Sequence, residues 1–183
     1  MNDASRTVAW RAVSEPRLTP TSHIVLGLIE ALEPATPYDL KRFAAQSVTN
    51  FWAIPHTQLY SECGRLAGLG LLDEERESGG RRRRIYRLTK AGRDALTAWR
   101  EDPEPATVEL RDAAILKLFF GADPKMLAES QLSSHRERLS EFEELAEVEM
   151  PEGMRLALDA GLNFERGHIR FWESVAKGTV GKA

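Results

Sequence analysis

The sequence predicts a mainly α-helical protein that contains one small β-hairpin. Three observations lead to this prediction. Apolar residues recur at helical spacing through most of the chain. The turn sequence Ser78-Gly79-Gly80 separates two short strand-like segments. The charge also changes sign between the halves, because residues 1–100 carry 15 Lys and Arg against 11 Asp and Glu, whereas residues 101–183 carry 10 against 17. Opposite charge in the two halves favours two domains with separate tasks.

Two helices that begin at prolines open the periodic part of the chain. Residues 1–18 come before them, have little periodicity, and are interpreted as a loose arm or a short docking helix. The first helix starts at Pro20, which suits a first helical turn, and it ends before Pro34. The second helix starts at Pro37, directly after Thr36, a residue type that favours the N-cap position.

A third helix, a hairpin and a fourth helix follow. The third helix begins at Pro55, and Gly70 is placed to end it. Its predicted buried face consists of Leu59, Cys63, Leu66 and Leu69, which are spaced by four, three and three residues. Strands are predicted from residue 71 and over residues 85–88, on either side of the turn. Thr89 then caps the fourth helix.

This order of elements over residues 19–102 is that of a winged helix-turn-helix domain. A small α+β domain with no nucleic-acid role has the same order, so that alternative stays open. In a helix-turn-helix protein the start of the recognition helix enters the major groove of DNA. The candidate DNA-binding residues of the third helix are His56, Thr57, Gln58, Tyr60, Ser61 and Arg65. The alternative interpretation is an ordinary solvated helix face.

Four consecutive arginines follow the predicted turn, and they are the second set of candidate DNA-binding residues: Arg81, Arg82, Arg83 and Arg84. At the tip of a hairpin they would project from the domain, which suits contact with phosphates or the minor groove. A solvated run of charge is one alternative. An acidic protein partner is another, and it leads to a second hypothesis of function, a protein-interaction module that docks through the arginine-rich hairpin.

The remaining residues, 103–183, are predicted to form an all-helical dimerisation domain. One helix is predicted over Thr107–Phe120, a second after the cap-and-proline pair Asp123-Pro124, and a third from Pro151. The last helix carries two adjacent apolar stripes, and one partner helix covers only a narrow seam. The sequence therefore predicts a homodimer, with dimerisation residues Leu158, Leu162, Phe164, Ile169, Phe171 and Trp172.

Three aromatic residues are candidates for an effector pocket that takes a small flat ligand: Trp99, Phe119 and Phe120. Packing in the core or in a dimer is the alternative interpretation. Catalytic motifs are missing from the sequence, which has no phosphate-binding loop and no GxSxG segment. Cys63 falls on the buried stripe of the third helix, so a core role is expected. We therefore expect that the protein is not an enzyme and that it has no cofactor and no metal site.

Composition excludes further classes of protein. The longest apolar run, residues 24–29, is far shorter than the roughly 20 residues that a membrane span needs. The N-terminus has no apolar segment typical of a secretory signal. A single cysteine excludes an internal disulfide framework and a cysteine-based zinc site. A cytoplasmic location is therefore expected.

Several stretches within residues 19–100 together resemble the PadR family of bacterial transcriptional regulators. The matching stretches are His23–Ile29, Thr36–Arg42, Phe51–Tyr60, Arg65–Leu72 and Arg84–Leu96. The C-terminal half matches mainly in length and helical character, and is similar to the subgroup with a longer C-terminal domain. One departure is Pro37 before Tyr38, where the family more often has glycine; this change should only stiffen the start of the second helix.

The resemblance implies a winged-helix homodimer that binds double-stranded operator DNA, usually as a repressor. It implies dimerisation through the C-terminal helices and contact between DNA and Tyr60, which lies at the position of the family's tyrosine in the third helix. It also implies that the wing, and with it Arg81 to Arg84, contacts the DNA backbone or the minor groove. Some members of the family bind phenolic or planar effectors.

Overall fold

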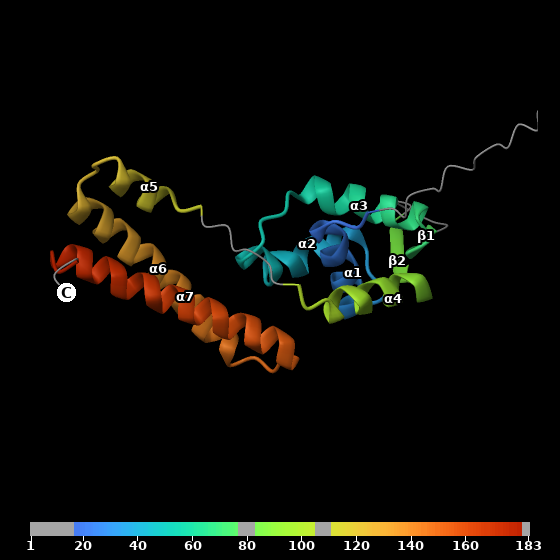
Figure 1. Cartoon of the computed structure of the whole chain (residues 1–183). Coiled ribbons are helices and arrows are strands. Elements are labelled where there is room, and N and C mark those ends of the chain that lie inside the picture. The colour runs from blue at the N-terminus through green and yellow to red at the C-terminus, as the bar shows by residue number, and fades with distance from the viewer. Residues whose placement is uncertain (1–16, 77–82, 105–110, 181–183) are drawn as a thin grey trace, which may run out of the picture. The chain divides into compact units, whose positions relative to one another are not determined.

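A computed structural model of the chain describes residues 17–76, 83–104 and 111–180 (Figure 1). The chain divides into two compact units, Met1–Glu104 and Pro105–Ala183. In the described residues, the first unit holds four α-helices, a short 3-10 helix and two strands, and the second holds three α-helices. The predicted fold class, mainly helical with one hairpin, is confirmed.

Local capping chemistry sets the start of the first two helices, α1 (Pro20–Leu32) and α2 (Pro37–Ala45). Thr19 and Thr36 are the N-caps. Each accepts a hydrogen bond from the backbone N–H three residues later, and the side chain at that position accepts one from the threonine N–H. This reciprocal pair satisfies two N–H groups that a helix start leaves without partners. Both starts agree with the prediction.

The third helix, α3 (His56–Gly68), follows a single turn of 3-10 helix, η1 (Val48–Asn50). Its apolar face packs against α1 and α2 (Figure 1). The core of this unit includes Val25, Leu26, Ile29, Leu40, Leu59, Cys63 and Leu66, all essentially inaccessible to solvent. Gly70 has a φ of 71°, a left-handed conformation that glycine adopts without strain, and the chain turns there into the hairpin.

The hairpin consists of β1 (Leu72–Arg76) and β2 (Arg84–Leu88), paired antiparallel so that the first residue of β1 lies opposite the last residue of β2. Ala35, between α1 and α2, adds an isolated bridge to Tyr86, with backbone hydrogen bonds of 3.1 and 2.8 Å. This bridge anchors the hairpin to the helices. The predicted turn Ser78-Gly79-Gly80 lies outside the described residues.

The fourth helix, α4 (Lys90–Glu101), is capped by Thr89, whose side chain accepts from the N–H of Gly92. The Thr89 hydroxyl also donates to the carbonyl oxygen of Gly70 at 2.8 Å. One side chain thereby joins the start of α4 to the end of α3. α4 also packs on α1, where Leu96 is buried.

The second unit contains α5 (Ala113–Phe119), α6 (Pro124–Ala146) and α7 (Glu152–Ala176). The two long helices lie side by side as a hairpin (Figure 1). α5 packs at one end of this helical hairpin, where four residues form a buried cluster: Ala114, Leu127, Ala128 and Trp172. This unit therefore has an apolar core of its own.

The predicted helix over Thr107–Phe120 is corrected by the structure. The helix begins at Ala113 because the Asp112 carboxylate accepts hydrogen bonds from the N–H groups of Ala114 and Ile115, at 2.7 and 3.0 Å. An aspartate in this N-cap position starts a helix and has a non-helical backbone itself. Residues 107–110 of the predicted helix lie outside the described residues.

Candidate nucleic-acid interface

α3 presents a polar surface on the side opposite its buried face. Leu59, Cys63 and Leu66 point into the core. The exposed side chains of the first two turns are His56, Thr57, Gln58, Tyr60 and Ser61. Hydroxyl, amide and imidazole groups can bond base edges or phosphate oxygens, and this is the chemistry of a recognition helix. The structure thus brings five of the six predicted α3 residues onto one accessible stretch.

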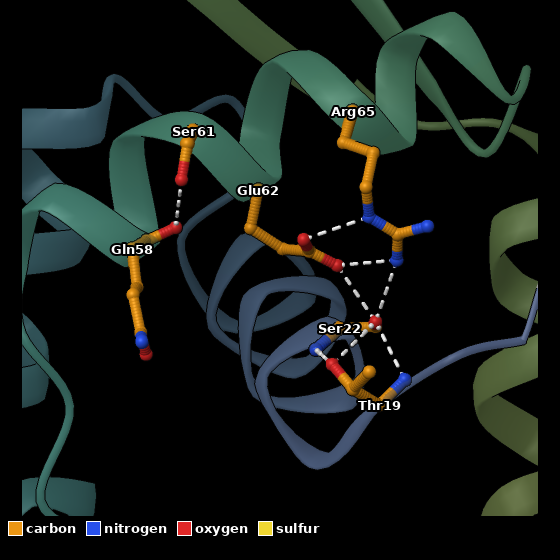
Figure 2. Close-up of polar contacts among 6 residues, drawn as sticks. All are labelled: Thr19, Ser22, Gln58, Ser61, Glu62 and Arg65. Atoms are coloured by element: carbon orange, nitrogen blue, oxygen red, sulfur yellow. Dashed lines mark hydrogen bonds and ion pairs between the residues drawn. The ribbon is translucent and has the colours of Figure 1, made fainter.

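Arg65, the sixth predicted residue, is held by a network of side chains that joins α3 to α1 (Figure 2). Its Nε donates to Glu62 Oε2 at 2.8 Å, and its Nη2 donates to Glu62 Oε1 at 2.6 Å. Nη2 also donates to the hydroxyl of Ser22 at 2.9 Å. Ser22, which is buried, donates in turn to Glu62 Oε1 at 2.6 Å and accepts from the N–H of Thr19 at 2.8 Å.

This network changes the electrostatics of both charged partners. The hydrogen bonds from Arg65 are the main reason that the pKa of Glu62 lies below its usual range, despite the opposing effect of burial. The same bonds raise the pKa of Arg65. Both groups are therefore charged at neutral pH and compensate each other. Sequence reasoning did not single out Ser22 or Glu62, although the three-residue spacing of Glu62 and Arg65 is a usual spacing for a helical ion pair.

The wing supplies the second set of predicted residues. Arg81 and Arg82 lie outside the described residues, and Arg83 is exposed. Arg84 starts β2, with its Nη1 3.5 Å from Glu74 Oε2 on the paired strand. Arg84 thus has an acidic neighbour inside the hairpin, which reduces the charge it can offer to a polyanion.

Glu74 is the acidic centre of the hairpin. It accepts a hydrogen bond from Arg76 Nε at 2.8 Å and another from the buried hydroxyl of Tyr86 at 2.9 Å. These bonds, the one from Arg76 first, lower the pKa of Glu74. Burial is the main reason that the pKa of Tyr86 is raised. Glu74 therefore fixes the base of the wing and was not found from the sequence.

The exposed surface of α2 is a further basic region that sequence reasoning did not include. Tyr38, Lys41, Arg42, Ala45 and Gln46 line a shallow hollow on this helix. The adjacent basic residues Lys41 and Arg42 could have indicated this surface from the sequence, because the helix period places them near Tyr38 and Ala45. A cationic hollow beside an aromatic ring suits a phosphate and its sugar.

The predicted dimerisation residues of α7 occupy different environments. Leu162 and Trp172 are buried within their own unit, where Trp172 belongs to the core cluster. Phe171 packs on that cluster, and Leu158 and Ile169 are half-buried. Phe164 is exposed to about half of its surface. Part of the wide apolar face of α7 is therefore covered by α5 and α6 of the same chain.

The predicted effector-pocket residues belong to the two separate units. In the first unit, Trp99 stacks on His23 with ring centroids 4.7 Å apart and planes 6° apart. In the second, Phe119 and Phe120 contact each other edge to face, and both are largely exposed. Each set presents aromatic surface to solvent. Burial lowers the pKa of His23, so its ring is the neutral form at neutral pH.

Within residues 17–76, 83–104 and 111–180, no group of three or more His, Cys, Asp or Glu side chains is arranged to hold a metal ion. The helices of these same segments include none that is both long enough and apolar enough to cross a membrane.

Cys63 is buried in the first unit, and burial raises the pKa of its thiol to about 12. The thiolate is the reactive form of cysteine, so at pH 8 reaction with a disulfide reagent should be roughly a thousandfold slower than for a free thiol. We expect a colorimetric thiol assay to detect no fast reaction in the native protein and one thiol per chain after denaturation in urea. Rapid reaction of native protein would show that α3 opens readily.

Sequence comparison relates this chain to known regulators. Residues 25–98 match the profile of the Transcriptional regulator PadR-like family. The negative transcriptional regulator PadR of Bacillus subtilis is 26% identical, in an alignment that covers 84% of this chain and 93% of that protein. The similarity therefore extends beyond the matched domain into the helical unit.

Solved structures share the fold. The Bacillus subtilis PadR structure in complex with operator DNA has a TM-score of 0.76 at 23% identity, covering 86% of this chain and 98% of that one. The structure of the PadR-like regulator BC1756 from Bacillus cereus has a TM-score of 0.73 at 18% identity, covering 89% of this chain and 99% of that one. The structure of Bacillus subtilis PadR in complex with p-coumaric acid has a TM-score of 0.69 at 20% identity, covering 89% of this chain and 98% of that one. These values show that the chain has the fold of those proteins.

Proposed function

We propose that the chain is a member of the PadR-like family of transcriptional regulators, whose profile residues 25–98 match, and that it is a sequence-specific DNA-binding repressor. It acts as a homodimer in the cytoplasm and carries out no catalytic step. The proposal draws on the relative from Bacillus subtilis, a negative transcriptional regulator, and on the related structure that holds operator DNA.

The division of α3 into two faces is the observation that carries the proposal. Its apolar face is fixed in the core of the first unit, so the helix cannot turn its polar face away from a partner. Gln58 lies in the first turn and is exposed. An amide side chain at this place can pair with the two groups that adenine presents in the major groove. Thr57 and Tyr60 flank it and supply hydroxyl groups for bases or phosphates.

A homodimer would present two such helices to two half-sites. Recognition helices in dimeric helix-turn-helix proteins lie about 34 Å apart, one turn of DNA, so the expected operator is a pseudo-palindrome. The helical unit supplies the dimer contact in this proposal, with exposed Phe164 near the middle of α7. The negative charge of residues 101–183 keeps that half away from DNA.

We extend the proposal to a small planar effector. The related PadR structure with p-coumaric acid supports this extension. So do two separate sets of exposed aromatic side chains, Trp99 in the first unit and Phe119 with Phe120 in the second, since aromatic rings commonly line ligand sites. Binding of such a compound would favour one arrangement of the dimer over another and thereby change operator affinity.

The decisive experiment replaces Gln58 by alanine. Fluorescence anisotropy would compare a duplex from upstream of the chain's own gene with a scrambled duplex, at several salt concentrations. We expect Gln58→Ala to lose about 1–3 kcal/mol of affinity for the specific duplex, because a base contact is removed, with an unchanged dependence on salt.

Arg83→Gln is the matched variant for a phosphate contact. It should weaken binding to both duplexes alike and lower the salt slope by about 1. Equal, weak binding of the wild-type protein to both duplexes would contradict the proposal for that fragment. It would favour the protein-interaction module instead, and a pull-down with an acidic peptide would then be the next test.

A further inference from the structure

We infer that Arg65 is a positioning residue that fixes the recognition helix on α1, and that it does not contact DNA itself. The inference rests on the proposed function and specifies how that site is held. Its basis is the network of Arg65, Glu62 and Ser22 in Figure 2, which spans two helices.

Most of the hydrogen-bond donors of the Arg65 guanidinium group are directed to partners inside the protein. Arginine has five N–H donors in a fixed planar arrangement. The Nε–H and the two Nη2–H groups are directed to Glu62 and Ser22, at 2.6 to 2.9 Å. Two parallel bonds to one carboxylate are the strongest form of this contact. Two donors remain, both on Nη1, and Figure 2 shows that nitrogen pointing away from the network.

The other members of the network make the contact costly to break. Ser22 is fully buried, and the Glu62 side chain is 12% exposed. If Arg65 swung toward a phosphate, it would leave the Glu62 carboxylate without its cation beside a polyanion. A partly buried charge that loses its partner destabilises a site more than the pair stabilises it. Glu62 therefore keeps Arg65 on the protein.

The network also joins two structures that decide the direction of α3. Ser22 belongs to the capping box that starts α1, where its hydroxyl accepts from the N–H of Thr19. Arg65 lies nine residues after the first residue of α3 and 43 residues after Ser22. A bond between these points resists rotation of α3 against α1. Small rotations matter, because a base contact requires its donors and acceptors to be in place.

The test measures specific and scrambled duplexes, each over a range of salt, for Arg65→Gln, Arg65→Lys and Glu62→Gln. We expect Arg65→Gln to lower the ratio of specific to non-specific affinity about tenfold, while the salt slope stays unchanged. Arg65→Lys should lower the ratio equally, because lysine keeps the charge but lacks the planar fork. Glu62→Gln should also lower the ratio, and it should raise the salt slope because it releases the cation of Arg65.

Two results would overturn the inference. A fall of about 1 in the salt slope for Arg65→Gln, restored by Arg65→Lys, would show a phosphate contact. Relaxed preference at a single base pair would show that Arg65 reads a base. Lys90→Gln is the matched control, because Lys90 forms an exposed ion pair with Asp94 on α4 at 2.6 Å; it should leave the ratio unchanged.

A measurement on the free protein separates this inference from the proposed function. If wild-type protein shows no preference between the duplexes, the proposed function fails, and the network is then tested by unfolding in urea. A double-mutant cycle of Ser22→Ala and Arg65→Gln should give a coupling of roughly fivefold or more in the unfolding constant. Additive effects would contradict the inference even where DNA binding is intact.

Discussion

Replacing Gly92 by alanine is expected to destabilise the first unit by at least about 3 kcal/mol, at the upper end of the cost of overpacking. A Cβ at this position would lie 2.1 Å from the carbonyl oxygen of Leu71 and 3.2 Å from Cδ2 of Leu88. The first of these is a backbone atom, so no side-chain rotation relieves the clash.

The carbonyl oxygen of Leu71 cannot easily move away. It accepts a hydrogen bond from the N–H of Thr89 at 3.2 Å, and Thr89 caps α4 through the N–H of Gly92 at 3.0 Å. A shift that makes room for the methyl group would therefore break the bond between Leu71 and Thr89 and separate the start of α4 from the Leu71 segment. The loss should appear in urea unfolding and as faster hydrogen exchange of α4 amides.

Gly27→Ala is the matched control, because a Cβ at Gly27 in α1 would meet nothing within 4 Å. Alanine has a higher helix propensity than glycine, so this variant should be more stable than the wild-type protein by up to about 1 kcal/mol. Near-native stability of Gly92→Ala would mean that α4 and the Leu71 segment do not meet as closely as the structure shows.

The elements that local chemistry determines were predicted well from the sequence. The starts of α1 and α2 depend on a threonine and a proline that are adjacent in the chain, and both lie where they were expected. The buried face of α3 follows from spacing: Leu59, Cys63 and Leu66 are buried. Leu69, the fourth predicted member, is the C-cap residue and is only half-buried. In each case the information lies within a few residues, and periodicity and capping can be read directly.

What sequence reasoning missed depends on contacts between distant residues. Arg65 pairs with Glu62, which the three-residue spacing could have indicated, but also with Ser22, which lies 43 residues earlier in the chain. Arg84 seemed available for DNA, but pairing of the strands brings Glu74 near it. Spacing along one helix cannot reveal such neighbours, since they follow from how the elements pack.

The apolar face of α7 shows the same limit in another form. Its two stripes predict a helix that needs more than one neighbour, and the structure places α6 along it. Spacing alone does not tell which neighbour comes from the same chain. Leu162 and Trp172 are buried by their own unit, whereas Phe164 remains exposed. The dimer contact thus remains a proposal, and Phe164 is its most accessible predicted residue.

Replacing His135 by alanine is the second change with a large expected effect, a loss of about 3 kcal/mol in the stability of the helical unit. His135 on α6 and Glu165 on α7 are both largely buried, and His135 Nδ1 lies 2.6 Å from Glu165 Oε2. Without the imidazole, the carboxylate of Glu165 stays in the helix interface and lacks this hydrogen bond. Urea unfolding followed by circular dichroism would measure the loss.

A double variant distinguishes the cost of an unpaired carboxylate from the loss of packing. Changing His135 and Glu165 together to leucine removes both polar groups and keeps the interface filled. Well-packed apolar replacements of a buried polar pair are often neutral or stabilising, so most of the lost stability should return. If the double variant were less stable than His135→Ala, the pair would itself stabilise the α6–α7 contact. If His135→Ala cost under about 1 kcal/mol, water would be reaching Glu165 and the interface would be looser than the structure shows.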